Sequence, residues 1–385
     1  MDKLVMSKSD EIIMKLVHYF VTEENYTPVI VKGVKDEIWL ENTEAFYKIV
    51  RINANYIHNV EQLNYDLFKV NNICKQIKRK TLTWKMRVVN ILLHLNEDIE
   101  VKDTKNIQTI VIRNISDVKK SSKLAAIFPE IKNNPLNDEK GLDLFIDVTN
   151  GINEKTDKKN KDYEEVFKPK KIVVTNVLIG INIACFVLTY LLFYASYGNI
   201  NLYDMFALDA NLVKNGEIYR LITGTFLHAG PIYFPMHLVF NMYCLKTVGS
   251  QLENFLGKAK FLVIYFASAL MGSLLSCVLT RELSIGASGA VFGLIGSLAY
   301  FGYHYRVYFG SVLKTQIIPL IIFNLLLGFC LSGIDNFAHI GGLIGGVLAT
   351  MGLGLKNKSQ VLERVNGVIV YVLLVIFLGF MIVAH

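Results

Sequence analysis

The second half of the chain consists of apolar runs that are each long enough to cross a lipid bilayer. A spanning helix needs about 20 mostly apolar residues. No water is available in the hydrocarbon to bond free peptide groups, so a spanning segment must be a helix or part of a closed barrel. Seven runs of this length lie near residues 172–194, 232–250, 260–280, 286–304, 315–332, 337–355 and 367–384. The sequence therefore predicts an α-helical membrane protein with a seven-helix bundle over residues 172–385.

The first half has a different character, because charged residues recur every few positions there. Apolar spacing predicts helices over residues 12–19, 65–79 and 121–128, and strands over 27–31, 47–52, 88–95 and 109–112. We therefore expect a small soluble α/β domain at residues 1–150. Residues 151–171 are rich in lysine, aspartate and asparagine, which predicts a flexible linker.

Charge sets the expected orientation of the spans. Lysine and arginine prefer cytoplasmic loops, and ten of them fall in loops on the side of the N-terminus: Lys168, Lys170, Lys171, Lys258, Lys260, Arg306, Lys314, Lys356, Lys358 and Arg364. The opposite loops hold three, namely Lys214, Arg220 and Arg281. The first apolar stretch, residues 12–20, is interrupted by lysine and histidine and has no small-residue cleavage site, unlike a signal peptide. We expect a multi-pass protein of the cell membrane with a cytoplasmic N-terminus and an extracellular C-terminus.

The same basic loops account for the formal charge of +7, so no nucleic-acid partner is expected. The five cysteines have no CxxC spacing, which predicts neither a metal site nor a cofactor. Asp36, Glu41, Glu44 and Lys48 loosely resemble a metal-dependent nuclease core, but solvent-facing charge on a meander is the favoured interpretation. The front domain is expected to regulate or recruit, through a partner that the sequence does not identify.

Glycines predict which spans are neighbours. Gly289 and Gly293 form a small-xxx-small pair in the fourth span, and Gly341/Gly345 and Gly342/Gly346 form two in the sixth. Such pairs let helix backbones approach closely in lipid. We expect the fourth and sixth spans to pack together.

Four polar residues inside the apolar runs are functional candidates, because polar groups at membrane depth are costly unless they are paired or face water. Ser288 begins the fourth span and His339 begins the sixth, so both are expected at a similar depth. Serine becomes a nucleophile when a base takes its proton, and histidine is the usual base. His237 and Asn241 share one face of the second span and can donate hydrogen bonds to a developing oxyanion.

These residues predict a Ser–His dyad for acyl transfer. Ser288 lies at a helix N-terminus, where free backbone N–H groups stabilise negative charge. Phe292, one turn later, is expected to pack against the imidazole. Asp335 lies four residues before His339 but is not favoured as a third member of the site.

The motifs resemble those of the rhomboid family of intramembrane serine proteases. They are Gly286-Ala287-Ser288-Gly289, Ala338-His339 with Gly341-Gly342, His237-Leu-Val-Phe-Asn241, Tyr219-Arg220, Phe226-Leu227-His228-Ala229-Gly230, and Gly249 with Leu252-Glu253 and Gly257. The resemblance covers residues 172–355, and the seventh span indicates the bacterial six-plus-one form with an N-terminal cytosolic domain. Three departures are Tyr219 where the family commonly has tryptophan, a longer segment between His228 and His237, and Phe292 where the family often has tyrosine.

By this resemblance, Ser288 is the nucleophile and His339 the general base, while His237, Asn241 and the Ser288 backbone N–H form the oxyanion site. Phe292, Glu253 and Arg220 are implied as structural support. The expected function is cleavage of transmembrane segments of membrane-protein substrates, without a cofactor. The alternative is a non-catalytic adaptor that binds transmembrane clients; inactive relatives typically lack the serine or the histidine, and this chain has both.

Overall fold

A computed structural model describes most of the chain, in two compact units at residues 1–162 and 163–385. The described residues are 6–31, 33–81, 83, 85–133, 136–196, 198, 200–228, 235–280, 283–330 and 333–384. Arg281 and His385, which enter the orientation argument, lie outside them, as do residues 229–234 of the longer segment after His228.

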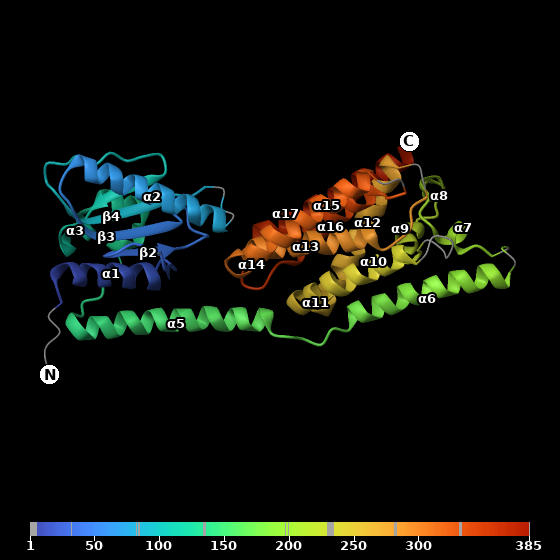
Figure 1. The fold of residues 1–385 in the computed structure, drawn as a ribbon, viewed down its shortest axis with the longest axis horizontal. Coiled ribbons are helices and arrows are strands. Elements are labelled where there is room, and N and C mark those ends of the chain that lie inside the picture. Colours follow the sequence, from blue (N-terminus) through green and yellow to red (C-terminus); the bar gives the residue numbers. More distant parts are fainter. Residues whose placement is uncertain are drawn as a thin grey trace. The chain divides into compact units, whose positions relative to one another are not determined.

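The first unit is built on a five-stranded sheet in the order β1-β2-β3-β4-β5 (Figure 1). The strands are β1 (Thr27–Val29), β2 (Glu37–Glu41), β3 (Ile49–Ile57), β4 (Val88–Leu95) and β5 (Ile107–Val111). The first three are antiparallel, whereas β3, β4 and β5 are parallel to one another. Helix α2 (Val60–Thr81) makes the crossover from β3 to β4, so the predicted α/β class is confirmed.

Helices cover both faces of this sheet. On one face lie α1 (Lys8–Thr22), α3 (Ile115–Lys120), α4 (Ser122–Ile127), the 3-10 turn η1 (Pro129–Lys132) and the start of α5 (Gly141–Phe167). On the other face α2 contributes Val70 and Cys74 to a second core with Ile49 and Val88. Neighbouring Val50 and Val89 belong to the first core, so β3 and β4 both bury apolar side chains on the two faces of the sheet. Residue spacing does not predict β2, because its five residues include glutamates at both ends.

The linker prediction is wrong over residues 151–167, which are helical as the continuation of α5. Leu144 and Val148 are buried in the first core, and Ile152 packs against it one turn later. The ammonium of Lys155 donates to Asn25 and to the carbonyl of Thr22. A helical face anchored at i, i+4 and i+8 therefore stabilises a sequence that composition alone assigns to coil.

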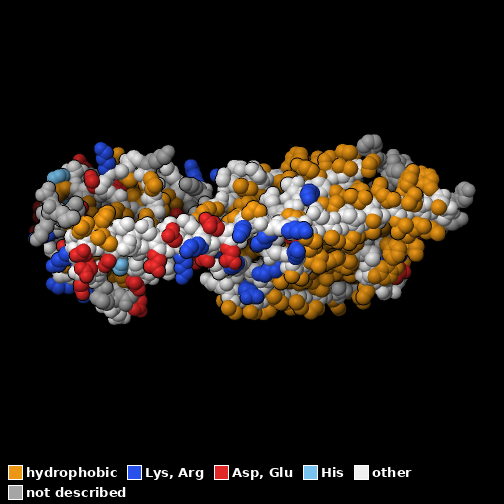
Figure 2. Space-filling model, turned by 90° about the horizontal axis from the view of Figure 1, so that it is seen from below, with side chains coloured by type: hydrophobic (Ala, Val, Ile, Leu, Met, Phe, Trp, Pro, Cys, Tyr) orange, Lys and Arg blue, Asp and Glu red, His pale blue; other side chains and the backbone are white. Residues whose placement is uncertain are grey.

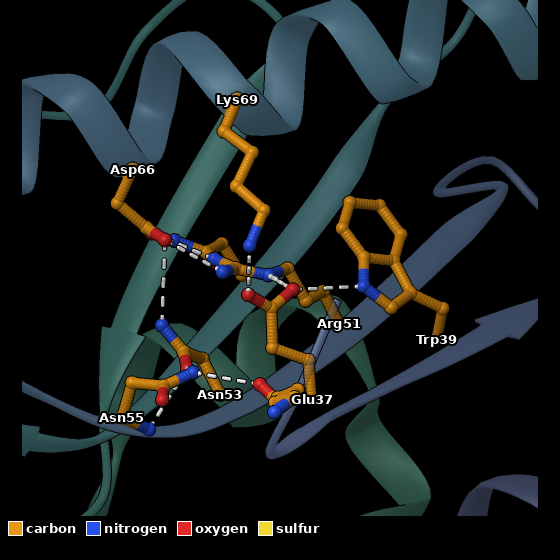
Figure 3. A network of polar contacts seen from close by, with 9 residues as sticks. Glu37, Trp39, Arg51, Asn53, Asn55, Asp66 and Lys69 are labelled. Carbon is orange, nitrogen blue, oxygen red and sulfur yellow. Dashed lines mark hydrogen bonds and ion pairs between the residues drawn. The ribbon is translucent and has the colours of Figure 1, made fainter. Parts of the chain in front are cut away.

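Buried ion pairs lie between the sheet and α2 (Figure 3). The guanidinium of Arg51 is fully buried and contacts Glu37 at 2.9 Å and Asp66 at 2.6 Å. Lys69 donates to the second oxygen of Glu37 at 2.6 Å. The members of this network differ from Asp36, Glu41, Glu44 and Lys48, the residues that the sequence pattern singled out. The described residues include no group of three or more potential metal ligands.

The second unit is helical, and Figure 2 shows its visible surface largely covered by hydrophobic side chains, with lysine and arginine gathered near one end. Five helical segments among the described residues are long and apolar enough to cross a membrane: α6 (Val174–Ala195), α12 (Lys258–Leu279), Tyr308–Cys330, α16 (Asn336–Leu353) and α17 (Val361–Ala384). The segment Tyr308–Cys330 runs through α14 (Arg306–Val312), the π-helical turn η5 (Leu313–Ile317) and α15 (Ile318–Cys330). It begins before the predicted residue 315, and α17 begins before residue 367.

The two remaining predicted spans are also helical but shorter or interrupted. The fourth is α13 (Ser288–His304), with 17 residues. The second comprises α10 (Met236–Cys244), the π-helical turn η4 (Leu245–Gly249) and α11 (Ser250–Leu256). Between α6 and α10 lie the short elements α7 (Leu202–Phe206), α8 (Ala210–Lys214), α9 (Arg220–Thr223) and η2 (Gly224–Phe226).

Helix α16 lies against both α12 and α13 at very short range. A Cβ placed on Gly342 would be 1.9 Å from the carbonyl oxygen of Gly289, and one on Gly346 would be 1.9 Å from that of Gly293. A Cβ on Gly341 would lie 2.6 Å from the Met271 oxygen of α12. The predicted packing of the fourth and sixth spans is therefore confirmed, and only glycine fits these positions.

Candidate active site

The candidate nucleophile and base lie at the same level of the bundle. Ser288 is the first residue of α13, and His339 is in the first turn of α16. Their neighbours almost touch, because a Cβ on Gly289 would be 3.2 Å from the carbonyl oxygen of Ala338. Ser288 is half-buried, whereas His339 is only 7% exposed. The glycine contacts thus bring together two residues that are 51 positions apart in the sequence.

Phe292 lies against the imidazole of His339. The two rings are stacked, with centroids 4.1 Å apart and planes inclined by 8°. Phe292 is one turn after Ser288 on α13, so the two residues share the side of α13 that faces the imidazole. The Nδ1 atom of His339 has no hydrogen-bond partner within the described part of the chain. Phe292 therefore holds the ring by packing, and the acidic side chain of Asp335 does not bond to it.

His237 and Asn241 lie on α10 and point at the loop that precedes Ser288. A Cβ on Gly286 would be 2.8 Å from His237 Nε2 and 3.9 Å from Asn241 Nδ2. The φ angle of Gly286 is +117°, a conformation that residues with a Cβ rarely adopt. Asn241 Nδ2 donates one hydrogen bond to the carbonyl of His237 at 2.9 Å, which leaves its second N–H for another acceptor. Both side chains thus bring polar nitrogens close to the backbone two residues before Ser288.

A small cavity lies beside the serine. It offers about 20 Å³ to the centre of a water molecule, which is room for one water. Three hydroxyl-bearing residues besides Ser288 are among those that line it: Thr225, Ser273 and Ser284.

Arg220 and Glu253 each tie together backbone segments of the same unit. Arg220 is 3% exposed and donates to the carbonyls of Ala207 at 2.8 Å and Asp204 at 2.7 Å. Glu253 on α11 accepts from the N–H groups of Val173, Val174 and Thr175 at 2.8–2.9 Å, and from the Thr175 hydroxyl. The carboxylate therefore caps the start of α6, whose first N–H groups have no partner inside the helix.

His228 has no role assigned from the sequence, and its surroundings place it near the oxyanion residues. Its ring centroid is 5.2 Å from that of His237, and its Nε2 faces the backbone N–H of Ala287 at 3.4 Å. The hydroxyl of Tyr203 donates to the carbonyl of His228 at 2.7 Å. The loop that carries His228 thus reaches the residue before Ser288.

Two polar contacts of α16 have no obvious signature in the sequence. Asp335 accepts hydrogen bonds from the Ala338 N–H and from the Ser276 hydroxyl of α12. Ser297 of α13 and Thr350 share a hydrogen bond further along. An aspartate three residues before a helical N–H is a recognisable N-cap, but its partner on α12 could only be found from the structure.

The fold and site define a polytopic helical membrane protein whose bundle holds a serine beside a small cavity, with two histidines and an asparagine on the neighbouring helices. A family model described as the rhomboid domain matches residues 215–356, which include all four. The chain is 28% identical over 366 residues to Rhomboid protease GluP of Bacillus subtilis, covering 90% of this chain and 70% of that protein. It is 40% identical over 151 residues to Putative rhomboid protease YdcA of the same organism, covering 38% of this chain and 73% of that protein.

A plant relative, RHOMBOID-like protein 4 of Arabidopsis thaliana, is 38% identical over 173 residues, which are 44% of this chain and 43% of that protein. The chain belongs to the rhomboid family. Relatives that are named as rhomboid proteases support an intramembrane protease function.

Proposed function

We propose that the chain is an intramembrane serine endopeptidase that cleaves transmembrane segments with a Ser288–His339 dyad. The observation that carries the proposal is the stack of Phe292 on His339, together with the close approach of Gly289 to Ala338. These contacts set the imidazole beside the turn of α13 that begins with the serine. The proposal accounts for the cost of keeping a serine and a histidine inside an apolar bundle.

In the proposed mechanism, His339 accepts the Ser288 proton as the hydroxyl oxygen attacks the scissile carbonyl. The negative charge that develops on the carbonyl oxygen accepts hydrogen bonds from His237 Nε2–H, Asn241 Nδ2–H and the Ser288 backbone N–H. Each such donor typically contributes about 3–4 kcal/mol to lowering the barrier. His339 then donates its proton to the leaving amine, which breaks the C–N bond and leaves an acyl-serine.

Water completes the reaction. His339 takes a proton from a water, the resulting oxygen attacks the acyl carbon, and Ser288 leaves with the proton returned by His339. The cavity lined by Thr225, Ser273 and Ser284 supports this step, because it has room for one water beside the serine. We propose that such a water supplies the hydrolytic oxygen.

We further propose that the substrate enters sideways between α10 and α15. Within α15, whose residues are all described, only Gly328 is buried, whereas α12 and α16 are much more enclosed. A loosely held helix can move aside at low cost. A helical peptide bond is shielded from attack, so substrates with small or helix-breaking residues should be cleaved most readily.

The orientation with the N-terminus in the cytoplasm is part of the proposal and rests on the distribution of lysine and arginine. The α/β unit would then lie in the cytoplasm, where we expect it to bind a regulatory or recruiting partner. Labelling of an introduced loop cysteine in intact cells with an impermeant thiol reagent tests this orientation.

The decisive experiment replaces Ser288 with alanine and measures cleavage of a single-pass substrate in liposomes. We expect activity to fall at least about 10⁴-fold, as when the nucleophile of a serine protease is removed. Ser297→Ala is the matched control, because Ser297 lies on the same helix nine residues beyond Ser288 and bonds to Thr350 of α16. A Ser288→Ala variant with full activity would contradict the proposal. Labelling by a fluorophosphonate probe that depends on Ser288 separates the enzyme from a non-catalytic adaptor.

A further inference from the structure

Glycines occupy the positions at which α16 contacts its two neighbouring helices most closely. Gly341 and Gly345 face α12, and Gly342 and Gly346 face α13. Glycine faces allow backbones to approach closely, which fixes the distance between the helices. These four positions carry no side chain of their own, so the contacts there come from backbone and from Met271 and Leu275 of α12, and they contain no hydrogen-bonding side chain that fixes the height of α16.

A shift of α16 along its own axis matters because His339 is on α16 and Ser288 is on α13. One residue of helix corresponds to about 1.5 Å along the axis. Reacting groups must be placed to within a fraction of this distance, since a misplacement of about 1 Å can cost about 100-fold in rate. Packing limits the axial position of α16, and a hydrogen bond close to His339 would fix it more closely.

Asp335 makes that contact at the end of α16 nearest to His339. Its Oδ1 accepts the Ala338 N–H at 2.9 Å, so the carboxylate is fixed to the first turn of the helix. Its Oδ2 accepts the hydroxyl of Ser276 at 2.5 Å, and Ser276 is 2% exposed on α12. The Asp335 carboxylate, one helical turn before His339, thus joins the first turn of α16 to Ser276 of α12.

A second hydrogen bond lies far from the site. Ser297 of α13 and Thr350 of α16 are 2.5 Å apart, eleven residues beyond His339. The Thr350 hydroxyl also bonds to the Gly346 carbonyl of its own helix at 2.7 Å. This bond offers a matched comparison, because it also joins α16 to a neighbour through a serine hydroxyl.

We propose that Asp335 is a positioning residue, whose bond to Ser276 sets the height of α16 and thereby the distance from the His339 imidazole to the Ser288 hydroxyl. The inference rests on the proposed dyad. Asp335 acts through the helix and not on the ring, because both its oxygens are used by Ala338 and Ser276. The hydrogen bonds carry the effect, so an amide in place of the carboxylate should preserve it.

The test measures kcat and KM for a single-pass substrate in liposomes, together with the thermal midpoint of each variant. We expect Ser276→Ala and Asp335→Ala to lower kcat by about 10- to 100-fold with KM within about twofold of the wild type. Asp335→Asn should keep kcat within about threefold, because asparagine also caps helices and its NH₂ can donate to Ser276. Ser297→Ala should keep kcat within about twofold, since its bond is remote from His339.

Several outcomes would overturn the inference. Wild-type kcat in both Ser276→Ala and Asp335→Ala would do so, as would equal losses of kcat in Ser276→Ala and Ser297→Ala. A folded Asp335→Asn variant as slow as Asp335→Ala would show that the charge acts instead of the bond. If Asp335→Ala does not fold, Ser276→Ala decides, because it keeps the cap. Ser288→Ala is assayed alongside: its inactivity preserves the proposed function even if the positioning role fails.

Discussion

Replacing Gly342 with alanine tests the contact between α13 and α16 most directly. The added Cβ would lie 1.9 Å from the carbonyl oxygen of Gly289, whereas real Cβ atoms essentially never approach a heavy atom within 3.0 Å. The obstacle is backbone, so the helices must separate by at least 3.0 − 1.9 = 1.1 Å. Gly342 is less than one turn from His339, and Gly289 is next to Ser288. Separation of the helices should therefore increase the distance between the Ser288 hydroxyl and the His339 imidazole.

We expect Gly342→Ala to lower kcat by about 100-fold, as a displacement of about 1 Å does. The strain should also destabilise the helical unit by about 1–3 kcal/mol, the usual cost of overpacking. The assay is cleavage of a single-pass substrate in liposomes, with the thermal midpoint followed by a thiol-reactive dye. Four of the five cysteines lie in this unit: Cys185, Cys244, Cys277 and Cys330.

Gly180→Ala on α6 is the matched control, because a Cβ there would meet no atom within 4 Å. It should leave kcat unchanged and stabilise α6 slightly, since alanine favours helix by about 1 kcal/mol over glycine. Wild-type kcat and midpoint in Gly342→Ala would refute the reasoning, because the two backbones could then not be in contact.

Two further predictions concern carboxylates. Burial alone would raise the pKa of Glu37, but hydrogen bonds from Arg51, the charge of Arg51 and the bonds from Lys69 and Trp39 outweigh it and lower the pKa from 4.5 to about 2. The lowered pKa contributes on the order of 3 kcal/mol of stability that is fully present above pH 4.5 and is lost as the pH falls towards 2. Urea unfolding of the full chain at several pH values measures this loss, because both tryptophans of the chain belong to the α/β unit and report its unfolding by fluorescence. The wild type and the exposed control Glu61→Gln should show the loss of stability at low pH, whereas Glu37→Gln should show much less of it. In the helical unit, Glu253→Ala should lower the free energy of unfolding by about 2–4 kcal/mol, because it leaves the first N–H groups of α6 unpaired. The change at an exposed neighbour, Gln251→Ala, should lower it by under about 0.5 kcal/mol. Equal thermal midpoints for the two variants in the thiol-dye assay would count against the role of Glu253 as a helix cap.

The bundle was predictable because its signals are local and strong. Each apolar run reflects the thickness of the hydrocarbon, and the glycine pairs on two runs indicate a close contact between them. The same glycine pairs predict that Ser288 and His339 lie near each other, and the close contacts of Gly289 with Ala338 and of Gly342 with Gly289 agree with this. The roles of the four candidate residues remain predictions that the proposed variants test.

Other features depend on tertiary partners and were therefore out of reach. Residues 151–167 have the composition of a linker, but the beginning of their helix is stabilised by packing of Leu144, Val148 and Ile152 in the first core. The residue pattern indicated Asp36, Glu41 and Glu44 but not Glu37, whose partner is a buried arginine 14 residues away that no spacing rule indicates. The bond between Asp335 and Ser276 joins residues 59 positions apart.

The shortness of α13 has a consequence for the surrounding lipid. Its 17 residues span about 26 Å, less than the roughly 30 Å of hydrocarbon in an average bilayer. A membrane that fits this helix must be locally compressed, or the end that carries Ser288 must stay below the headgroups. Acyl-chain length should thus act as a control on turnover, with short-chain vesicles exposing the serine to water more readily than long-chain ones.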